Sequence, residues 1–309
     1  MGKHLGIYST SADVQTAVDS MELSKPYVAY IENDDVLDYD SKTIDYSKMP
    51  LTFEILSGGN IYWKYTSYND TGARTIQYSK NGGEWTNITA AKDDTVYIST
   101  VSGDILQFKS NNGSTSNNSS VYNFFANDAN VRFNMQGNVY SLLSSSAYTS
   151  ITSIGNFCLM YVFQNIGVVN AENLKLPATT LATGAYTGMF RGCTSLTTVP
   201  ELPATTLGIQ CYMTMFNNCK NLTKAPDLLY TGAVPGAAYY NMFYGCDNLN
   251  YVKCLATDVS ADAWGSKATG DWLYKVASTG TFVKHPEMTS WETGSNGIPD
   301  GWTVVDAVL

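Results

Sequence analysis

A Met-Phe or Val-Phe pair recurs along the middle of this chain at nearly constant spacing. The four pairs are Val162-Phe163, Met189-Phe190, Met215-Phe216 and Met242-Phe243. The successive spacings are 27, 26 and 27 residues. A period of this length is typical of repeat architectures, in which one supersecondary unit stacks on the next. The pattern predicts a solenoid over residues 147–256, whose long exposed faces suit binding or display better than catalysis.

Other positions keep register with each Phe and predict the inside of the solenoid. A residue that returns once per turn must fill the same volume against its neighbours. The predicted columns are aromatic (Phe163, Phe190, Phe216, Phe243), cysteine (Cys193, Cys219, Cys246) and leucine (Leu196, Leu222, Leu249). A further column of small residues consists of Cys158, Ala185, Cys211 and Ala238.

The six cysteines predict apolar packing rather than chemistry. Ile166 stands in the cysteine column in the first repeat, and Cys alternates with Ala in the small column. No two cysteines have the close spacing of paired zinc ligands. Cys193 and Cys219 could be stacked neighbours, but parallel side chains on adjacent turns suit packing better than a disulfide. We expect free, buried thiols, a reducing compartment, and no metal ion or cofactor.

The repeat resembles a known family once its whole unit is considered. Met189-Phe190-Arg191-Gly192-Cys193-Thr194-Ser195-Leu196, followed by Val199-Pro200-Glu201-Leu202-Pro203, is similar to the unit of BspA-like leucine-rich repeats. The resemblance covers residues 150–256. It implies a leucine-rich-repeat solenoid, and proteins with such repeats resemble surface and adhesion proteins more than enzymes. The third unit departs from the pattern, as expected at the end of an array.

Composition excludes several classes of partner. The net charge is −9 and the few basic residues form no run, which argues against nucleic acid. No stretch approaches the ~20 apolar residues of a membrane span, and the first residues lack the apolar core of a signal peptide. The sequence therefore predicts folding in a cytosol. A surface adhesin would need an export signal, whereas a virion protein assembled in the host cytoplasm would not.

Residues 1–48 predict an attachment or oligomerisation segment. A short helix is expected behind Ser11, and a hairpin over 27–39 around the polar turn 32–35. The segment is too small to bury a core of its own, so docking or pairing between copies would order it. Its aspartates lack the Gly and terminal Glu of a calcium loop, which favours a solvated hairpin.

Residues 49–146 predict an Ig-like β-sandwich. The expected strands are 51–56, 61–65, 75–78, 96–100, 105–108, 131–135 and 139–142. Asn81-Gly82-Gly83 is a hairpin-turn signal, and residues 111–120 read as an exposed loop. Regular short strands of this kind are typical of a sandwich.

Residues 257–309 hold four of the six tryptophans, Trp264, Trp272, Trp291 and Trp302. A cap that covers the open end of the solenoid is the favoured interpretation, because an unpaired end exposes apolar residues. A sugar-binding platform is the alternative.

Catalytic signals are sparse. The chain has two histidines, His4 and His285, and we find no nucleophile elbow or phosphate-binding glycine loop. Glu201 and Asp227 occupy equivalent repeat positions and predict a solvated acidic rim, with a site for glycan hydroxyls as the alternative. No catalytic residue is predicted. A glycan hydrolase is the last of the functional hypotheses.

Taken together, the sequence predicts a mostly β chain with short helices, ordered as anchor segment, sandwich, solenoid and cap. As a whole it resembles head fibres and related appendage proteins of tailed phages that infect Bacteroidetes, through Tyr8–Val14 and Gly297–Val304. The resemblance implies a trimeric structural virion protein, bound to capsid or other virion proteins through residues 1–48, with its repeats contacting host-surface or mucus glycans. A tail-associated receptor-binding protein and a bacterial cell-surface adhesin are the alternatives.

Overall fold

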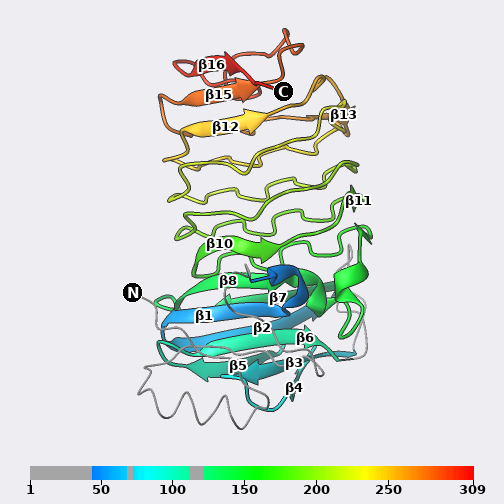
Figure 1. Ribbon diagram of the computed structural model, residues 1–309, viewed down its shortest axis with the longest axis vertical. Coiled ribbons are helices and arrows are strands. Elements are labelled where there is room, and N and C mark those ends of the chain that lie inside the picture. Colours follow the sequence, from blue (N-terminus) through cyan, green and yellow to red (C-terminus); the bar gives the residue numbers. More distant parts are fainter. Residues whose placement is uncertain (1–43, 68–71, 112–120) are drawn as a thin grey trace.

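The protein is mostly β, built from several sheets (Figure 1). The computed structural model describes residues 44–67, 72–111 and 121–309. Within those ranges the helical elements are three short 3-10 turns: η1 (Tyr46–Lys48), η2 (Val139–Leu142) and η3 (Tyr148–Ser150). The helix expected behind Ser11 and the hairpin expected over 27–39 lie outside the described residues.

Two sheets form the N-terminal part of the molecule. The six-stranded sheet has the order β10-β8-β1-β6-β3-β4, and the three-stranded sheet has the order β5-β2-β7. Their strands are β1 (Leu51–Ser57), β2 (Gly59–Ser67), β3 (Ala73–Lys80), β4 (Thr86–Ala91), β5 (Thr95–Thr100), β6 (Ile105–Ser110), β7 (Val121–Asn127), β8 (Arg132–Asn138) and β10 (Val168–Lys175). All neighbouring pairs are antiparallel except β10 with β8, which is parallel.

Alternating apolar residues explain why these strands form. In β1, Leu51, Phe53 and Ile55 are buried, because side chains two residues apart share one face of a strand. Six of the seven expected strands are confirmed as β1, β2, β3, β5, β6 and β8. The strand expected over 139–142 is wrong: the Asn138 side chain accepts a hydrogen bond from the Tyr140 N–H at 3.0 Å and turns the chain into η2.

The predicted hairpin turn is confirmed between β3 and β4. Asn81 and Gly82 both have positive φ, 54° and 72°, as the two central residues of a tight hairpin turn require. The Gly83 N–H donates to the Lys80 carbonyl at 3.0 Å and closes the turn.

The two sheets pack face to face through aromatic rings. Phe125 on β7 lies 5.2 Å from Phe53 and 4.8 Å from Phe108 of the other sheet, measured between ring centroids. The order of the described strands differs from the four-plus-three arrangement of immunoglobulin domains. The connectivity of these two sheets is therefore their own.

Beyond β10 the repeat units stack side by side and exchange backbone hydrogen bonds at alternate residues. In the first unit the backbone N–H groups of alternate residues donate to carbonyls of the next unit: Leu159 to Ala185, Tyr161 to Thr187 and Phe163 to Met189. The same pattern recurs in each later unit. The intervening N–H groups close tight turns within their own unit; for example, the Met160 N–H donates to the Phe157 carbonyl. Because successive N–H groups bond alternately to the next unit and to their own turn, all of these donors are paired although no long strand forms.

The sheets and the repeats form one continuous core across the predicted boundary at 146/147. The Phe125 N–H of β7 donates to the Val162 carbonyl at 2.9 Å. The Phe163 ring packs on Phe125 with a centroid distance of 5.8 Å, and β10 extends the six-stranded sheet. The N-terminal sheets therefore cover the first repeat (Figure 1).

The stack continues into the segment predicted as a cap. The Phe243 N–H donates to the Trp272 carbonyl, so Trp272-Leu273 takes the place of a Met-Phe pair 30 residues after the last one. Parallel strands β12 (Tyr251–Cys254), β15 (Thr281–Lys284) and β16 (Thr303–Asp306) follow one another to the far end (Figure 1). Short pairs complete the layout: β9 (Ser153–Ile154) with β11 (Thr180–Leu181), and β13 (Asp262–Ala263) with β14 (Ser266–Lys267).

Candidate functional site

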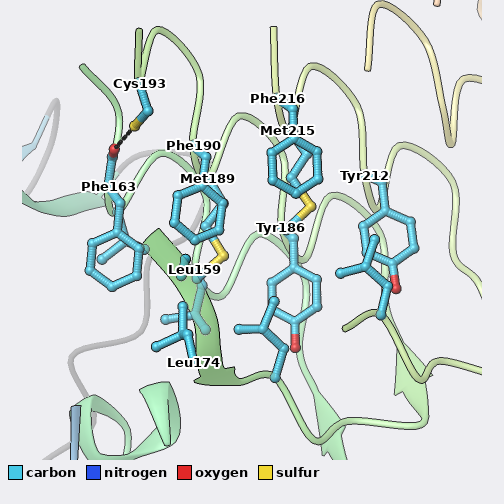
Figure 2. Close-up of a cluster of buried hydrophobic side chains, with 14 of the residues drawn as sticks. Leu159, Phe163, Leu174, Tyr186, Met189, Phe190, Cys193, Tyr212, Met215 and Phe216 are labelled. Carbon is cyan, nitrogen blue, oxygen red and sulfur yellow. Dashed lines mark hydrogen bonds between the residues drawn. The ribbon is translucent and has the colours of Figure 1, made fainter. Parts of the chain in front are cut away.

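The aromatic residues predicted to form a column lie one above the other in the core. Centroid distances from Phe163 through Phe190 and Phe216 to Phe243 are 5.7, 5.6 and 5.7 Å, and Figure 2 shows the first three rings. The predicted leucines Leu196, Leu222 and Leu249 are also fully buried. These residues hold adjacent units together and are closed to any ligand from solvent.

All six cysteines are free and buried, the environment expected for them. In the column of Cys193, Cys219 and Cys246, each Sγ lies 3.1 to 3.2 Å from the carbonyl of the Phe one unit earlier. Burial raises the pKa of Cys193 and Cys246 to about 12. Because the thiolate is the nucleophile and the metal ligand, these protonated thiols are suited to packing.

The core contains a second aromatic column that was not predicted from the sequence. Tyr186, Tyr212 and Tyr239 stack at centroid distances of 5.9 and 6.1 Å, and Trp272 and Trp291 extend the column at 6.1 and 5.6 Å. The signal was present, since each of these tyrosines lies four residues before a repeated Phe. Leu159 fills that position in the first unit.

The tryptophans of the C-terminal segment separate into two kinds. Trp272 and Trp302 are buried, and their Nε1–H groups donate to the carbonyls of Gly297 and Ala277 at 2.8 Å. Trp291 packs against both Trp272 and Phe282. Trp264, at the tip of the β13–β14 hairpin, has 74% of its surface exposed. The tryptophans thus do not form one common platform.

The other predicted polar positions differ in their surroundings. Glu201 is exposed, whereas Asp227 accepts a hydrogen bond from Lys253 Nζ at 3.1 Å. His285 is buried and its Nδ1 accepts the Glu287 N–H at 3.2 Å. His4 lies outside the described residues.

A hollow of about 210 Å³ lies near the C-terminal end of the stack, and sequence analysis did not find it. It is lined by Asp258, Val259, Ser260, Lys267, Thr269, Met288, Ser290, Glu292 and Asn296. Two segments supply these residues: 258–269, which includes the β13–β14 hairpin, and 288–296 of the following turn. No repeated pattern marks these positions, because the hollow is formed where the regular stack is interrupted.

The polar groups of the hollow are arranged by internal bonds. Lys267 Nζ donates to both Glu292 oxygens, at 2.8 and 3.0 Å. The Asp258 carboxylate accepts the Ser260 N–H at 2.8 Å, and that bond holds the pKa of Asp258 below its ordinary value. Asn296 receives the Asp271 N–H on its side-chain oxygen at 2.9 Å and the Thr269 hydroxyl on its carbonyl at 2.8 Å.

A local insertion accounts for the position of the hollow. The inter-unit hydrogen bonds join residues 26 apart from Leu159 to Ala185, but 29 apart from Tyr239 to Ala268. The additional residues form the β13–β14 hairpin, whose last residue, Lys267, lines the hollow. Insertions in repeat proteins map to loops on one face, which is often the binding face.

Two further features are absent from the described residues. No group of three or more His, Cys, Asp or Glu side chains is placed to hold a metal ion. No helix in those ranges is long and apolar enough to cross a membrane. Comparisons of the chain with protein-family models, curated proteins and solved structures found no match.

Proposed function

We propose that this chain is a non-enzymatic display protein whose repeats form a leucine-rich-repeat solenoid of the BspA-like kind. The proposal rests on one observation: the side chains of the Phe, Tyr, Cys and Leu columns are all buried and pack in the core. Such a stack supplies a rigid rod with long lateral faces. The N-terminal sheets cover one end, and residues 257–309 extend the stack at the other.

The same proposal places the protein on a phage particle as a head fibre. Its support is the resemblance of the chain to virion appendage proteins of phages that infect Bacteroidetes. Residues 1–48 would attach it to capsid or other virion proteins and organise a trimer in the host cytoplasm. The solenoid would then project outward and contact host-surface or mucus glycans.

Deletion of residues 1–48 tests the attachment. Particles assembled with the full chain should carry it after purification, and particles assembled with the truncated chain should not. Light scattering of the two purified proteins should show a trimer that is lost on truncation. Recovery of the truncated protein on particles would overturn the proposal, and gold labelling on tails instead of heads would favour a tail-associated receptor-binding protein.

A further inference from the structure

We propose that the hollow between residues 258–269 and 288–296 binds one ring of a neutral saccharide. This inference rests on the proposed display function and names the site through which the solenoid would contact glycans. Three features support it: the hydrogen-bonding groups of the lining, the charge and size of the hollow, and an exposed tryptophan on the same hairpin.

The lining offers both acceptors and donors with spare capacity. An ammonium has three donor hydrogens and a carboxylate about four acceptor sites, so the Lys267–Glu292 pair retains free positions on both groups. Asn296 uses its side-chain oxygen for the Asp271 N–H, and its NH₂ group provides donors. Each hydroxyl of a sugar both donates and accepts, and therefore matches such a mixed set.

Charge and apolar contacts narrow the class of ligand. The lining contains two carboxylates, Asp258 and Glu292, and one ammonium, Lys267, and this excess of negative charge disfavours phosphate, sulfate and acidic sugars. Val259 and Met288 line the same hollow and can contact the C–H groups of a ring. The volume of about 210 Å³ lies below the roughly 300–1,000 Å³ of sites for drug-sized molecules, which suits a single ring.

Trp264 gives the site a second contact for a longer chain. It stands on the hairpin that supplies Lys267, three residues away, so their Cα atoms are at most about 11 Å apart. Its indole is 74% exposed. A neighbouring ring of an oligosaccharide can stack on that apolar face while the first ring occupies the hollow.

The test uses the full chain on an array of neutral and sialylated oligosaccharides. Titration calorimetry follows with the neutral oligosaccharide that gives the strongest signal. Glu292→Gln removes the charge of one lining group, and Ser290→Tyr fills the hollow. The matched control is Asp247→Asn, because Asp247 also forms an exposed ion pair, with Lys220 at 2.7 Å, outside the hollow. Thermal unfolding verifies that each variant is folded.

We expect neutral saccharides to bind and sialylated ones not to. Each lining variant should weaken binding about tenfold or more, because Glu292→Gln removes the charge that strengthens its hydrogen bonds to hydroxyls and Ser290→Tyr occupies the space of the ring. Asp247→Asn should leave binding unchanged, and Trp264→Ala should weaken oligosaccharides more than the single ring. Absence of wild-type binding, or wild-type affinity in folded Glu292→Gln and Ser290→Tyr, overturns the inference.

The outcome is separable from that of the proposed function. A protein that is recovered on particles but binds no saccharide overturns this inference alone. A protein that binds saccharide through the hollow but is never found on particles overturns the proposed virion role alone.

Discussion

Single residues in adjacent repeats are fitted to one another in complementary pairs. At the left-handed positions of the stack, a large side chain of one unit lies over a glycine of the next: Phe157 over Gly184, Tyr161 over Gly188 and Asn165 over Gly192. A Cβ on Gly188 would lie 2.1 Å from the Tyr161 ring. Backbone conformation favours these glycines, and the side chain above each one leaves no room for a Cβ.

Gly188→Ala should be more destabilising than an alanine at a left-handed glycine with free space around it. Gly82, with φ of 72° and no atom within 4 Å of an added Cβ, is the control. We expect Gly82→Ala to lower the free energy of unfolding by about 1–2 kcal/mol through backbone strain alone. Gly188→Ala should cost about 1–3 kcal/mol more through overpacking. Urea denaturation measures both, and equal costs would contradict the packing account.

The buried thiols should make the protein less stable in alkali. Burial raises the pKa of Cys193, Cys211 and Cys246 to about 12 from the ordinary value of 9. A folded-state pKa above the unfolded value gives stability that is complete below pH 9 and is lost as the pH rises toward 12. Each such thiol should remove about 1.4 kcal/mol per pH unit in that window.

Urea unfolding of the wild type and of Cys193→Ala/Cys246→Ala across this pH range tests the prediction. The double variant should show the shallower fall of unfolding free energy with pH. Phe216→Leu, which is destabilised without loss of a titratable group, should keep the wild-type slope. Identical slopes in wild type and double variant would rule out the linkage.

At the scale of elements, the C-terminal segment is part of the repeat core and also carries an exposed hairpin. Trp272 stacks between Tyr239 and Trp291 and replaces the Met of the repeated pair. Trp264, eight residues earlier, lies on the β13–β14 hairpin and is mostly exposed. The two tryptophans therefore have different roles: Trp272 packs in the core, and Trp264 is presented to solvent.

Substitution of these two tryptophans distinguishes the roles. Trp272→Ala should lower the free energy of unfolding by about 3–5 kcal/mol, because it leaves a large cavity between two aromatic rings. Trp264→Ala should change it by no more than about 0.5 kcal/mol. Chemical denaturation monitored by far-UV circular dichroism gives both values. A large loss for Trp264→Ala would mean that the hairpin is structural.

At the same scale, the sequence predicted most strands of the N-terminal sheets because apolar residues alternate within them. It missed β7, although Phe125 there is buried. It also missed β4, in which only Ile88 and Ala90 are buried among Asn, Thr and Ala, residues with weak or mixed strand preference. It placed a strand at 139–142 because Val139 and Leu142 are apolar, but the side-chain bond from Asn138 outweighs that preference.

For the whole molecule, the central feature is one core that runs from the two sheets into the last turns. Phe53 of β1 and Phe125 of β7 both contact Phe163, the first member of the repeated column. The Phe rings then continue to Phe243, which packs on Trp272. No break in this chain of contacts separates sheets from repeats among the described residues.

Such continuity predicts a single thermal transition. Calorimetry of the full chain should give one peak with a calorimetric enthalpy equal to the van't Hoff enthalpy. Phe53→Ala should move the whole peak to lower temperature, although Phe53 lies outside the repeats. Two peaks, only one of which responds to Phe53→Ala, would show that the sheets and the stack unfold separately.

The sequence by itself determined which residues recur, and therefore which ones fill the core. A period of 26 to 27 residues identified the Phe, Cys and Leu columns, because equivalent positions of stacked units must share one environment. Tertiary structure alone decided that β10 joins the N-terminal sheet, that the stack continues through Trp272, and that an inserted hairpin forms a hollow. Those features depend on contacts between segments with no common pattern, such as 258–269 and 288–296, and only the folded chain brings such segments together.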